Sequence, residues 1–217
     1  MLQFKSKDGI ECDDFIKFAV SQMNNSLCSE AEKKTRAESE NPLWHELRFE
    51  RITASKIFEF THCKTPEGTF VESIIGAYKV RDNKFMKRGR LLEKKVLKCA
   101  EQKVKCKFQE CGFFTMPLLP VLGASPDGIS KDYVVEIKCP SSVKNKNTYI
   151  KDNNITAKFK GQLHLQMLCD ASPDFEESNN VEILEIDFDE QFANELTAAA
   201  IENWENFVFP KLFVSCQ

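Results

Sequence analysis

Two short stretches of the sequence bring together the residue types that hydrolytic chemistry needs. Residues 123–129 are Gly-Ala-Ser-Pro-Asp-Gly-Ile, and residues 135–140 are Val-Glu-Ile-Lys-Cys-Pro. Side chains alternate along a strand, so Glu136 and Lys138 are expected to share one face. If Asp127 ends the neighbouring strand, its carboxylate can converge with that of Glu136. Together with the carbonyl oxygen of Ile137 they would form a hard oxygen site that suits Mg²⁺, with Mn²⁺ as the alternative.

This combination fits phosphodiester hydrolysis, which requires a divalent ion and a cation near the attacked phosphate. Lys138 beside Glu136 could orient or deprotonate water and stabilise the developing charge. A third acid is usually needed to hold two ions, and Glu93 is the candidate, although a surface ion pair explains it equally well. Pro-Asp-Gly is also an ordinary turn and Glu-x-Lys is common on strands, so the spacing alone leaves a simple hairpin open.

Charge is unevenly distributed along the chain. Residues 79–107 carry twelve Lys or Arg against three acids, whereas residues 161–210 contain no Lys or Arg and twelve acids. The basic block could contact a phosphate backbone, and the alternative is a solvated helix face. The net charge of −3 decides nothing about a polyanionic partner.

Composition limits the class of protein. A chain of 217 residues that is 42% hydrophobic can fold as one domain with a normal core. It contains no apolar run of 18 residues, so no membrane partner is expected, and no secretory signal is expected at its start. The nine cysteines are an odd number without a Cys-x-x-Cys pair, which favours reduced thiols in an intracellular protein. Nucleus and cytoplasm stay undecided, because the basic run 84–90 could be a nuclear signal or could line a DNA groove.

Helices are expected in the first half of the chain. Asn41 followed by Pro42 is typical of a helix start, and the apolar spacing beyond it predicts two short helices with a bend after Phe49. A helix is expected from Thr65 to about Val80. Another is expected over 87–102, with Leu91 and the later apolar residues turned inward. Residues 1–40 are a polar lead-in, either loosely helical or partly ordered.

Strands are expected at 104–109, 112–116, 118–124, 133–138 and 181–188. Residues 156–169 are expected to form a helix. Asp189 is expected to cap a last helix over 190–209 that Pro210 ends. The order of elements predicts a single-domain α/β sandwich with a mixed central sheet flanked by helices.

Five anchors in the right order then make the chain resemble the lambda-type exonucleases, the YqaJ-like viral recombinase family within the PD-(D/E)xK nucleases. The resemblance covers roughly Asn41 to Leu212, so the domain is placed at 41–217. The anchors are Trp44-His-Glu-Leu-Arg48 with Ile52-Thr-Ala-Ser55, Gly89-x-x-x-Glu93, Ser125-Pro-Asp127-Gly, Glu136-Ile-Lys138-Cys-Pro, and Gln162-Leu-His-Leu-Gln166.

The resemblance implies a restriction-endonuclease-like fold and a set of site residues. It implies that Arg48 and Ser55 contact DNA phosphate and that Gln162 reaches the active site. The metal ligands would be Glu93, Asp127, Glu136 and the Ile137 carbonyl, and the catalytic set would be Asp127, Glu136, Lys138 and Gln162. The implied activity is 5′→3′ digestion of linear duplex DNA from a 5′-phosphate end, for recombination or DNA processing. A single-strand annealing partner and a ring-shaped oligomer are left open, since no interface signal supports either.

The sequence also departs from the family pattern. About eight residues, equivalent to a strand and its turn, are missing after Leu168, so the domain is expected to be shortened near 168–172. His164 replaces a family glutamine and is expected to be a solvated or packed histidine rather than a ligand. Gln166 is expected to be a solvated helix residue.

Two other functions compete with the nuclease. A nuclease-derived module that binds DNA ends without cutting them is motivated by the shortened segment. A protein-interaction domain would require the five anchors to be accidental, and a smooth basic face without a cleft would be its sign. The acids needed for cleavage are all present, which favours the nuclease.

Overall fold

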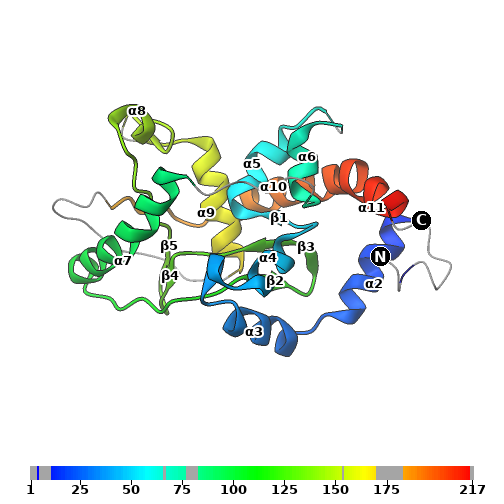
Figure 1. Cartoon of the computed structure of the whole chain (residues 1–217), viewed down its shortest axis with the longest axis horizontal. Helices are drawn as coiled ribbons and strands as arrows, with labels where there is room; N and C mark the ends of the chain where they lie inside the picture. Colours follow the sequence, from blue (N-terminus) through cyan, green and yellow to red (C-terminus); the bar gives the residue numbers. More distant parts are fainter. Residues whose placement is uncertain are drawn as a thin grey trace.

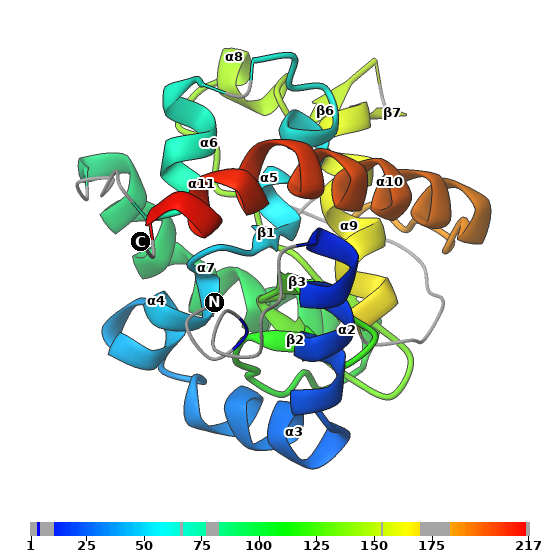
Figure 2. The same ribbon diagram turned by 90° about the vertical axis from the view of Figure 1, so that its right-hand side faces the viewer.

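The computed structural model describes residues 4, 11–65, 67–76, 83–152, 154–169 and 183–215. A small mixed sheet forms the middle of the molecule, with helices on both of its faces (Figure 1). Turned by 90°, the chain shows α5, α6, α10 and α11 above the sheet, α3 below it and α2 alongside it (Figure 2). The predicted α/β layering with helices around a mixed sheet is confirmed. No helix among these residues is long and apolar enough to span a bilayer.

The central sheet has the strand order β1-β3-β2. Strand β3 (Leu119–Ala124) lies in the middle, parallel to β1 (Ile52–Thr53) and antiparallel to β2 (Phe114–Met116). Five of the six residues of β3 are buried, as expected of a strand covered on both faces. Gly123 is required in this strand, because a Cβ there would lie 2.4 Å from the ring of Phe113.

A β-hairpin extends the structure beyond this sheet. Strands β4 (Gly128–Ile129) and β5 (Val134–Val135) pair antiparallel, and an isolated bridge joins Gln109 to Ile129. The predicted strands at 104–109 and 133–138 are therefore too long. In each predicted strand, a side chain takes a backbone N–H that the ladder would need. Glu101 accepts the N–H of Phe108, and Asp127 accepts that of Ile137. A donor that is bonded to a side chain cannot extend a strand ladder.

The helices that follow Asn41 agree with the predicted break. Asn41 accepts the N–H of Leu43, with Pro42 in the first turn, and α4 (Pro42–Arg48) is separated from α5 (Ala54–Thr61). Helix α6 (Thr69–Ile74) is shorter than predicted and is preceded by Gly68, whereas residues 77–80 of that prediction lie outside the described part.

Helix α7 (Lys84–Val104) contains the predicted helix 87–102 and is longer at both ends. Leu91 is not turned inward, since it is 75% exposed. Leu92, Val96 and Ala100 repeat every four residues and line the inner face, and Leu91 lies about 100° away from that face around the helix.

Helix α9 (Ala157–Cys169) matches the prediction closely, and Asp189 caps α10 (Glu190–Asn203) by accepting the N–H of Phe192. Pro210 does not end the last helix. A π-helical turn (Trp204–Val208) leads directly into α11 (Phe209–Ser215), and the chain stays helical through Pro210. Short elements α8 (Val143–Lys146), β6 (Ile150–Lys151) and β7 (Asn154–Ile155) precede α9.

No strand forms over residues 183–188, contrary to the prediction, and residues 170–182 lie outside the described part. Residues 183–187 and β5 line a common cavity of about 520 Å³. The predicted shortening near 168–172 falls largely on residues that the structure does not describe.

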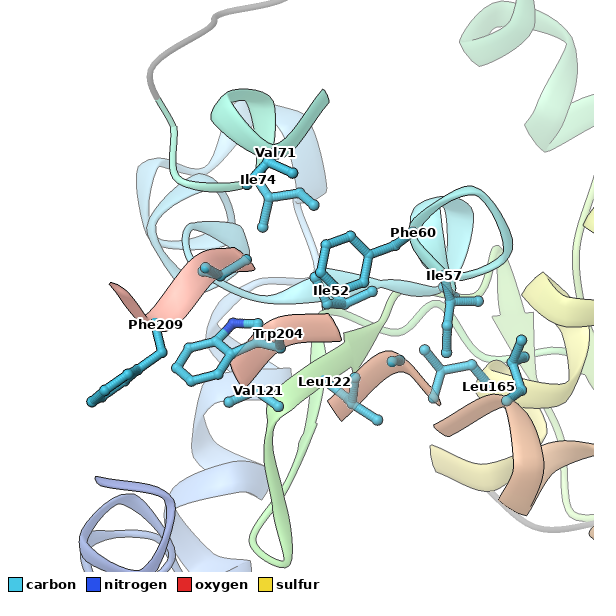
Figure 3. Close-up of a cluster of buried hydrophobic side chains, with 14 of the residues drawn as sticks. Ile52, Ile57, Phe60, Val71, Ile74, Val121, Leu122, Leu165, Trp204 and Phe209 are labelled. Carbon is cyan, nitrogen blue, oxygen red and sulfur yellow. The ribbon is translucent and has the colours of Figure 1, made fainter. Parts of the chain in front are cut away.

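The hydrophobic core lies between β3 and the helices above it (Figure 3). Ile52, Ile57, Phe60, Leu122 and Trp204 are all at most 1% exposed. The Trp204 indole N–H donates to the Glu50 carbonyl at 2.7 Å, so the buried ring keeps its polar group bonded. Helix α2 (Cys12–Gln22) joins this core through Phe15, whose ring stacks on Trp204 at 5.8 Å.

Within the predicted polar lead-in, residues 11–40 contain the α-helices α2 and α3 and a short 3₁₀ helix (Glu38–Glu40), in line with the helical alternative. In α3 (Asn25–Lys34), the buried carboxylate of Glu32 accepts the backbone N–H of Gly112 at 2.9 Å and a bidentate bond from Arg36. The Thr35 hydroxyl accepts the N–H of Phe113 at 2.8 Å. Gly112 allows this close approach, because a Cβ there would lie 2.1 Å from the Glu32 carbonyl oxygen. Helix α3 and Thr35, the residue that follows it, therefore bind the backbone N–H groups of the segment that leads into β2.

Replacing Glu32 by Ala is expected to lower the free energy of unfolding by about 2–4 kcal/mol, because it leaves a buried N–H and a guanidinium without their acceptor. Urea unfolding followed by circular dichroism measures the change. Glu30→Ala is the matched control, since Glu30 also pairs with a residue four positions on but is exposed. Equal midpoints for Glu32→Ala and the wild type would contradict this role of Glu32.

Candidate active site

The hairpin β4–β5 positions Asp127 and the residues that follow β5. The Asp127 N–H donates to the Val135 carbonyl at 2.9 Å, and its Oδ2 accepts the Ile137 N–H at 2.5 Å. The turn at residues 130–133 is closed by a bond from the Ser130 N–H to the Tyr133 carbonyl at 2.8 Å. The local pairing therefore brings Asp127 beside the Glu136–Lys138 segment, as the spacing predicted.

Glu136 lies at the centre of a hydrogen-bonded cluster. Its Oε1 accepts from the Lys138 ammonium and, at 2.6 Å, from the Gln162 amide. Its Oε2 accepts from the Gln166 amide, also at 2.6 Å. The Glu136 side chain is only 6% exposed, so these donors replace the water that a carboxylate otherwise requires.

Lys138 faces the same side as Glu136 and is 24% exposed. Its ammonium lies 5.7 Å from the ring centre of Tyr149 and 5.6 Å from that of Phe159. Burial lowers the pKa of Lys138, but the Glu136 carboxylate outweighs this effect, and the pKa is raised overall. The side chain is thus held as a cation in this arrangement.

The remaining acids concentrate negative charge around Glu136. Burial, then the charges of Glu136 and Glu93, raise the pKa of Asp127 well above its usual range. Burial and Glu136 likewise raise the pKa of Glu93, which α7 presents to the site. Arg88, five residues before Glu93, donates to the Cys139 carbonyl at 3.0 Å. This bond links α7 to the end of the Glu136–Pro140 segment.

A cationic subsite adjoins the carboxylates. The Arg48 guanidinium lies 4.0 Å from the ring centre of Trp44, and burial lowers the pKa of Arg48 to about 10. Within the described residues, Arg48 forms no hydrogen bond or ion pair. The Trp44 indole donates to the Ser125 hydroxyl at 2.9 Å, which joins this subsite to the Ser-Pro-Asp segment.

Ser55 lies in the first turn of α5 and is exposed, with its hydroxyl 3.3 Å from that of Thr53. Lys56 follows it, and its ammonium donates to the carbonyl and hydroxyl of Ser73, both at 3.1 Å. Burial and the charge of Arg48 lower the pKa of Lys56. Arg48 and Lys56 thus form a pair of neighbouring cations, of which the sequence had indicated only the first.

Two site residues were missed by sequence reasoning. Burial first, and then the charges of Glu93 and Glu136, raise the pKa of Glu38 to about 7, so Glu38 belongs to the electrostatics of the site. No signal marked it, because residues 1–40 have no motif. Gln166 was expected to be solvated but is 1% exposed and bonded to Glu136, and its spacing of four from Gln162 was the available signal.

His164 is a packed histidine, one of the two structural roles expected for it. It is fully buried, its Nδ1–H donates to the Lys160 carbonyl at 2.9 Å, and its Nε2 accepts the Asp189 N–H at 3.1 Å. These two bonds require the neutral imidazole, and burial lowers the pKa of His164 accordingly.

The donor set suits a hard divalent cation. Asp127, Glu136 and Glu93 provide carboxylate oxygens, and burial, followed by the neighbouring carboxylates, raises the pKa of Asp127 and of Glu93. In the part of the chain that the structure describes, no three His, Cys, Asp or Glu side chains are gathered tightly enough to hold an ion as they stand. The Lys138 ammonium instead neutralises Glu136.

The fold and this arrangement of residues define a PD-(D/E)xK nuclease fold. Two crystal structures of the alkaline exonuclease LHK-Exo are similar to the chain: one from Laribacter hongkongensis, and one of LHK-Exo in complex with dAMP. The complex has a TM-score of 0.62 and 19% identity, and the match covers 79% of this chain and 94% of the other. The second has a TM-score of 0.57 and 21% identity, with 79% and 97% covered. No curated protein matches the chain.

Residues 43–173 match the model of the YqaJ-like viral recombinase domain. The chain belongs to this family, and the resemblance inferred from the five anchors is confirmed. The match covers α4 through α9 and therefore every site residue named above except Glu38.

His164 is expected to titrate below the free imidazole value of about 6.5. Because its pKa is lowered in the folded state, the unfolded chain binds the extra proton first, and stability falls as the pH drops from about 6.5 to the lowered value. Imidazole resonances followed by NMR against pH measure this, with His45→Gln and His62→Gln used for assignment. A His164 resonance that titrates at or above pH 6.5 would contradict the neutral, doubly bonded imidazole.

Proposed function

We propose that the protein is a divalent-metal-dependent DNA exonuclease that digests linear duplex DNA in the 5′→3′ direction. The observation that carries this proposal is the cluster in which Lys138, Gln162 and Gln166 donate to Glu136 beside Asp127. Membership of the YqaJ-like family supports it, as does the fold shared with an alkaline exonuclease.

The side chains have two kinds of role: some would bind the metal ion, and others would stabilise charge or orient water. Asp127, Glu136 and Glu93 would hold Mg²⁺ or Mn²⁺, with the Ile137 carbonyl as a further ligand. The bound ion would supply Lewis-acid activation of the phosphate and of water. Lys138, held as a cation, stabilises the negative charge that develops on the phosphate oxygens. Gln162 is placed to orient water or the Lys138 ammonium, because its amide and Lys138 meet at the same oxygen of Glu136.

The cationic subsite would bind the 5′-phosphate of a DNA end. Arg48 is stacked on Trp44 with its N–H groups unpaired among the described residues, which prepares a planar fork for phosphate oxygens. The exposed Ser55 hydroxyl and the first turn of α5 add donors. A phosphate held there would set which end of a strand enters the site, which is the physical basis for the proposed polarity.

Helix α7 would line the path of the DNA. Its exposed basic residues are Lys84, Lys87, Arg88, Arg90, Lys94, Lys95 and Lys98. Gly89 has no atom within 4 Å of where its Cβ would lie, which leaves open space one turn before Glu93. The remaining single strand would be the substrate of a single-strand annealing protein, the partner class that the proposed reaction implies.

Lys138→Ala and Asp127→Asn are each expected to reduce cleavage by about a hundredfold or more, because each removes a group that interacts with the developing charge or its ion. The assay uses linear duplex DNA labelled at one 5′-phosphorylated end, in Mg²⁺ and in EDTA. Lys17→Ala, an exposed lysine of α2 that pairs with Asp14, is the control and should digest like the wild type.

Cleavage that persists in EDTA, or in either site variant, would refute the assignment of these residues. A folded wild type that binds DNA ends and does not digest them in Mg²⁺ would favour the end-binding module instead. The position of the released label gives the polarity.

Arg48→Gln is expected to reduce the preference for 5′-phosphorylated over 5′-hydroxyl ends by about tenfold, the value of one charge-assisted hydrogen bond. Arg51→Gln is the matched control, because the Arg51 guanidinium is already bonded to the Pro120 and Leu47 carbonyls. The ratio of the two digestion rates is the readout, since it does not depend on how much protein is folded. A ratio that changes equally in both variants would rule out a specific role of Arg48.

A further inference from the structure

The amide of Gln166 is an unusual group to find in the core of a helix interface. Gln166 is 1% exposed, and Leu165 beside it, equally buried, is apolar. Its Nε2 donates to Glu136 Oε2 at 2.6 Å and lies 3.4 Å from the Ser125 carbonyl oxygen. Its Oε1 is buried and has no hydrogen-bond partner in the described part of the chain.

This arrangement costs stability. A buried acceptor without a donor loses the hydrogen bond that it forms with water in the unfolded chain, and an apolar side chain of the same length would avoid that loss. The amide cannot be rotated to relieve it, because Oε1 would then face Glu136 Oε2, and two acceptors would meet. Packing therefore does not account for a glutamine here, whereas its donation to Glu136 does.

The contacts of Gln166 differ from those of the other donors. Lys138 and Gln162 share Oε1 of Glu136 and are both partly exposed, so both can turn toward water or substrate. Gln166 bonds the other oxygen from the buried side. Its contact with the Ser125 carbonyl also links Glu136 to the Ser-Pro-Asp segment that carries Asp127.

We propose that Gln166 is a positioning residue that fixes the rotation of the Glu136 carboxylate, so that Oε1 faces the site and Glu136 is held at a set place relative to Asp127. This inference rests on the proposed function, because it assigns Glu136 to the binding of a divalent ion. Residues that orient a ligating carboxylate typically contribute tenfold to a hundredfold in metal affinity or activity.

The test compares Gln166→Met with the wild type. Methionine keeps the length and removes both the donor and the unpaired acceptor. The thermal midpoint in EDTA is expected to change little, because removal of the unpaired acceptor offsets the loss of one donor to the buried Glu136 carboxylate. The dissociation constant for Mg²⁺, measured by titration calorimetry without DNA, is expected to rise by about tenfold or more. Digestion at limiting Mg²⁺ should fall and should recover in part as Mg²⁺ is raised.

Gln191→Met is the matched control, an exposed glutamine of α10 bonded to Glu195, and should leave the midpoint, the Mg²⁺ affinity and digestion unchanged. A Mg²⁺ affinity of Gln166→Met within twofold of the wild type would overturn the inference. So would a lowered midpoint with an unchanged affinity of the folded fraction, which is the result of a purely structural role.

The outcomes separate this inference from the proposed function. A wild type that digests DNA, with a Gln166→Met variant that binds Mg²⁺ equally well, refutes the positioning role alone. A wild type that binds Mg²⁺ without digesting DNA refutes the exonuclease, and the affinity comparison still decides the role of Gln166. A wild type that neither binds Mg²⁺ nor digests DNA refutes both.

Discussion

The buried carboxylate of Glu136 is the constraint around which the site is built. A negative charge that is 6% exposed must be matched by donors, since an unpaired buried charge costs far more than any single contact returns. The donors come from two separate parts of the chain: Lys138 lies two residues away, and Gln162 and Gln166 project from α9. Satisfying one side chain therefore fixes a helix against the hairpin.

Helix α9 must in turn keep a fixed position along its axis and a fixed rotation about it. Gly161 of α9 faces Phe58 of α5, where a Cβ would lie 3.4 Å from the Phe58 side chain. On its far side, His164 accepts the N–H of Asp189, which caps α10. The glutamines and the histidine are on one helix, so the bonds that secure α9 to the core also aim its amides at Glu136. The packing of α9 and the geometry of the site cannot vary independently.

The parts of the site that could be predicted from the sequence are those set by local rules. Asn41 and Asp189 were identified as caps because capping depends on neighbouring residues alone. Asp127, Glu136 and Lys138 were brought together by a short hairpin and period-two alternation. The five ordered anchors supplied the family, which the match over residues 43–173 confirms.

The errors arose where a distant or competing contact decided the outcome. Strand lengths were overestimated because Asp127 and Glu101 take N–H groups that a ladder would have used. Gln166 was misjudged because its burial depends on how α9 packs, and a pattern of polar residues on a helix does not reveal that. Leu91 was wrongly assigned to the buried face of α7. Which residues of a helix are buried depends on the elements that pack against it.

The N-terminal helices show most clearly how such contacts reach the site. The family match begins at residue 43, yet Glu32 and Thr35 of the preceding segment hold the N–H groups of Gly112 and Phe113. The Gly112 carbonyl accepts the Ser125 hydroxyl, which in turn accepts the Trp44 indole on which Arg48 stacks. The same segment contributes Glu38, whose pKa is raised to about 7 by burial first and then by the charges of Glu93 and Glu136. Arg48 opposes that rise, so Glu38 lies between the carboxylates and the cationic subsite in electrostatic terms. Residues outside the family match are thus part of the wall and of the charge balance of the site.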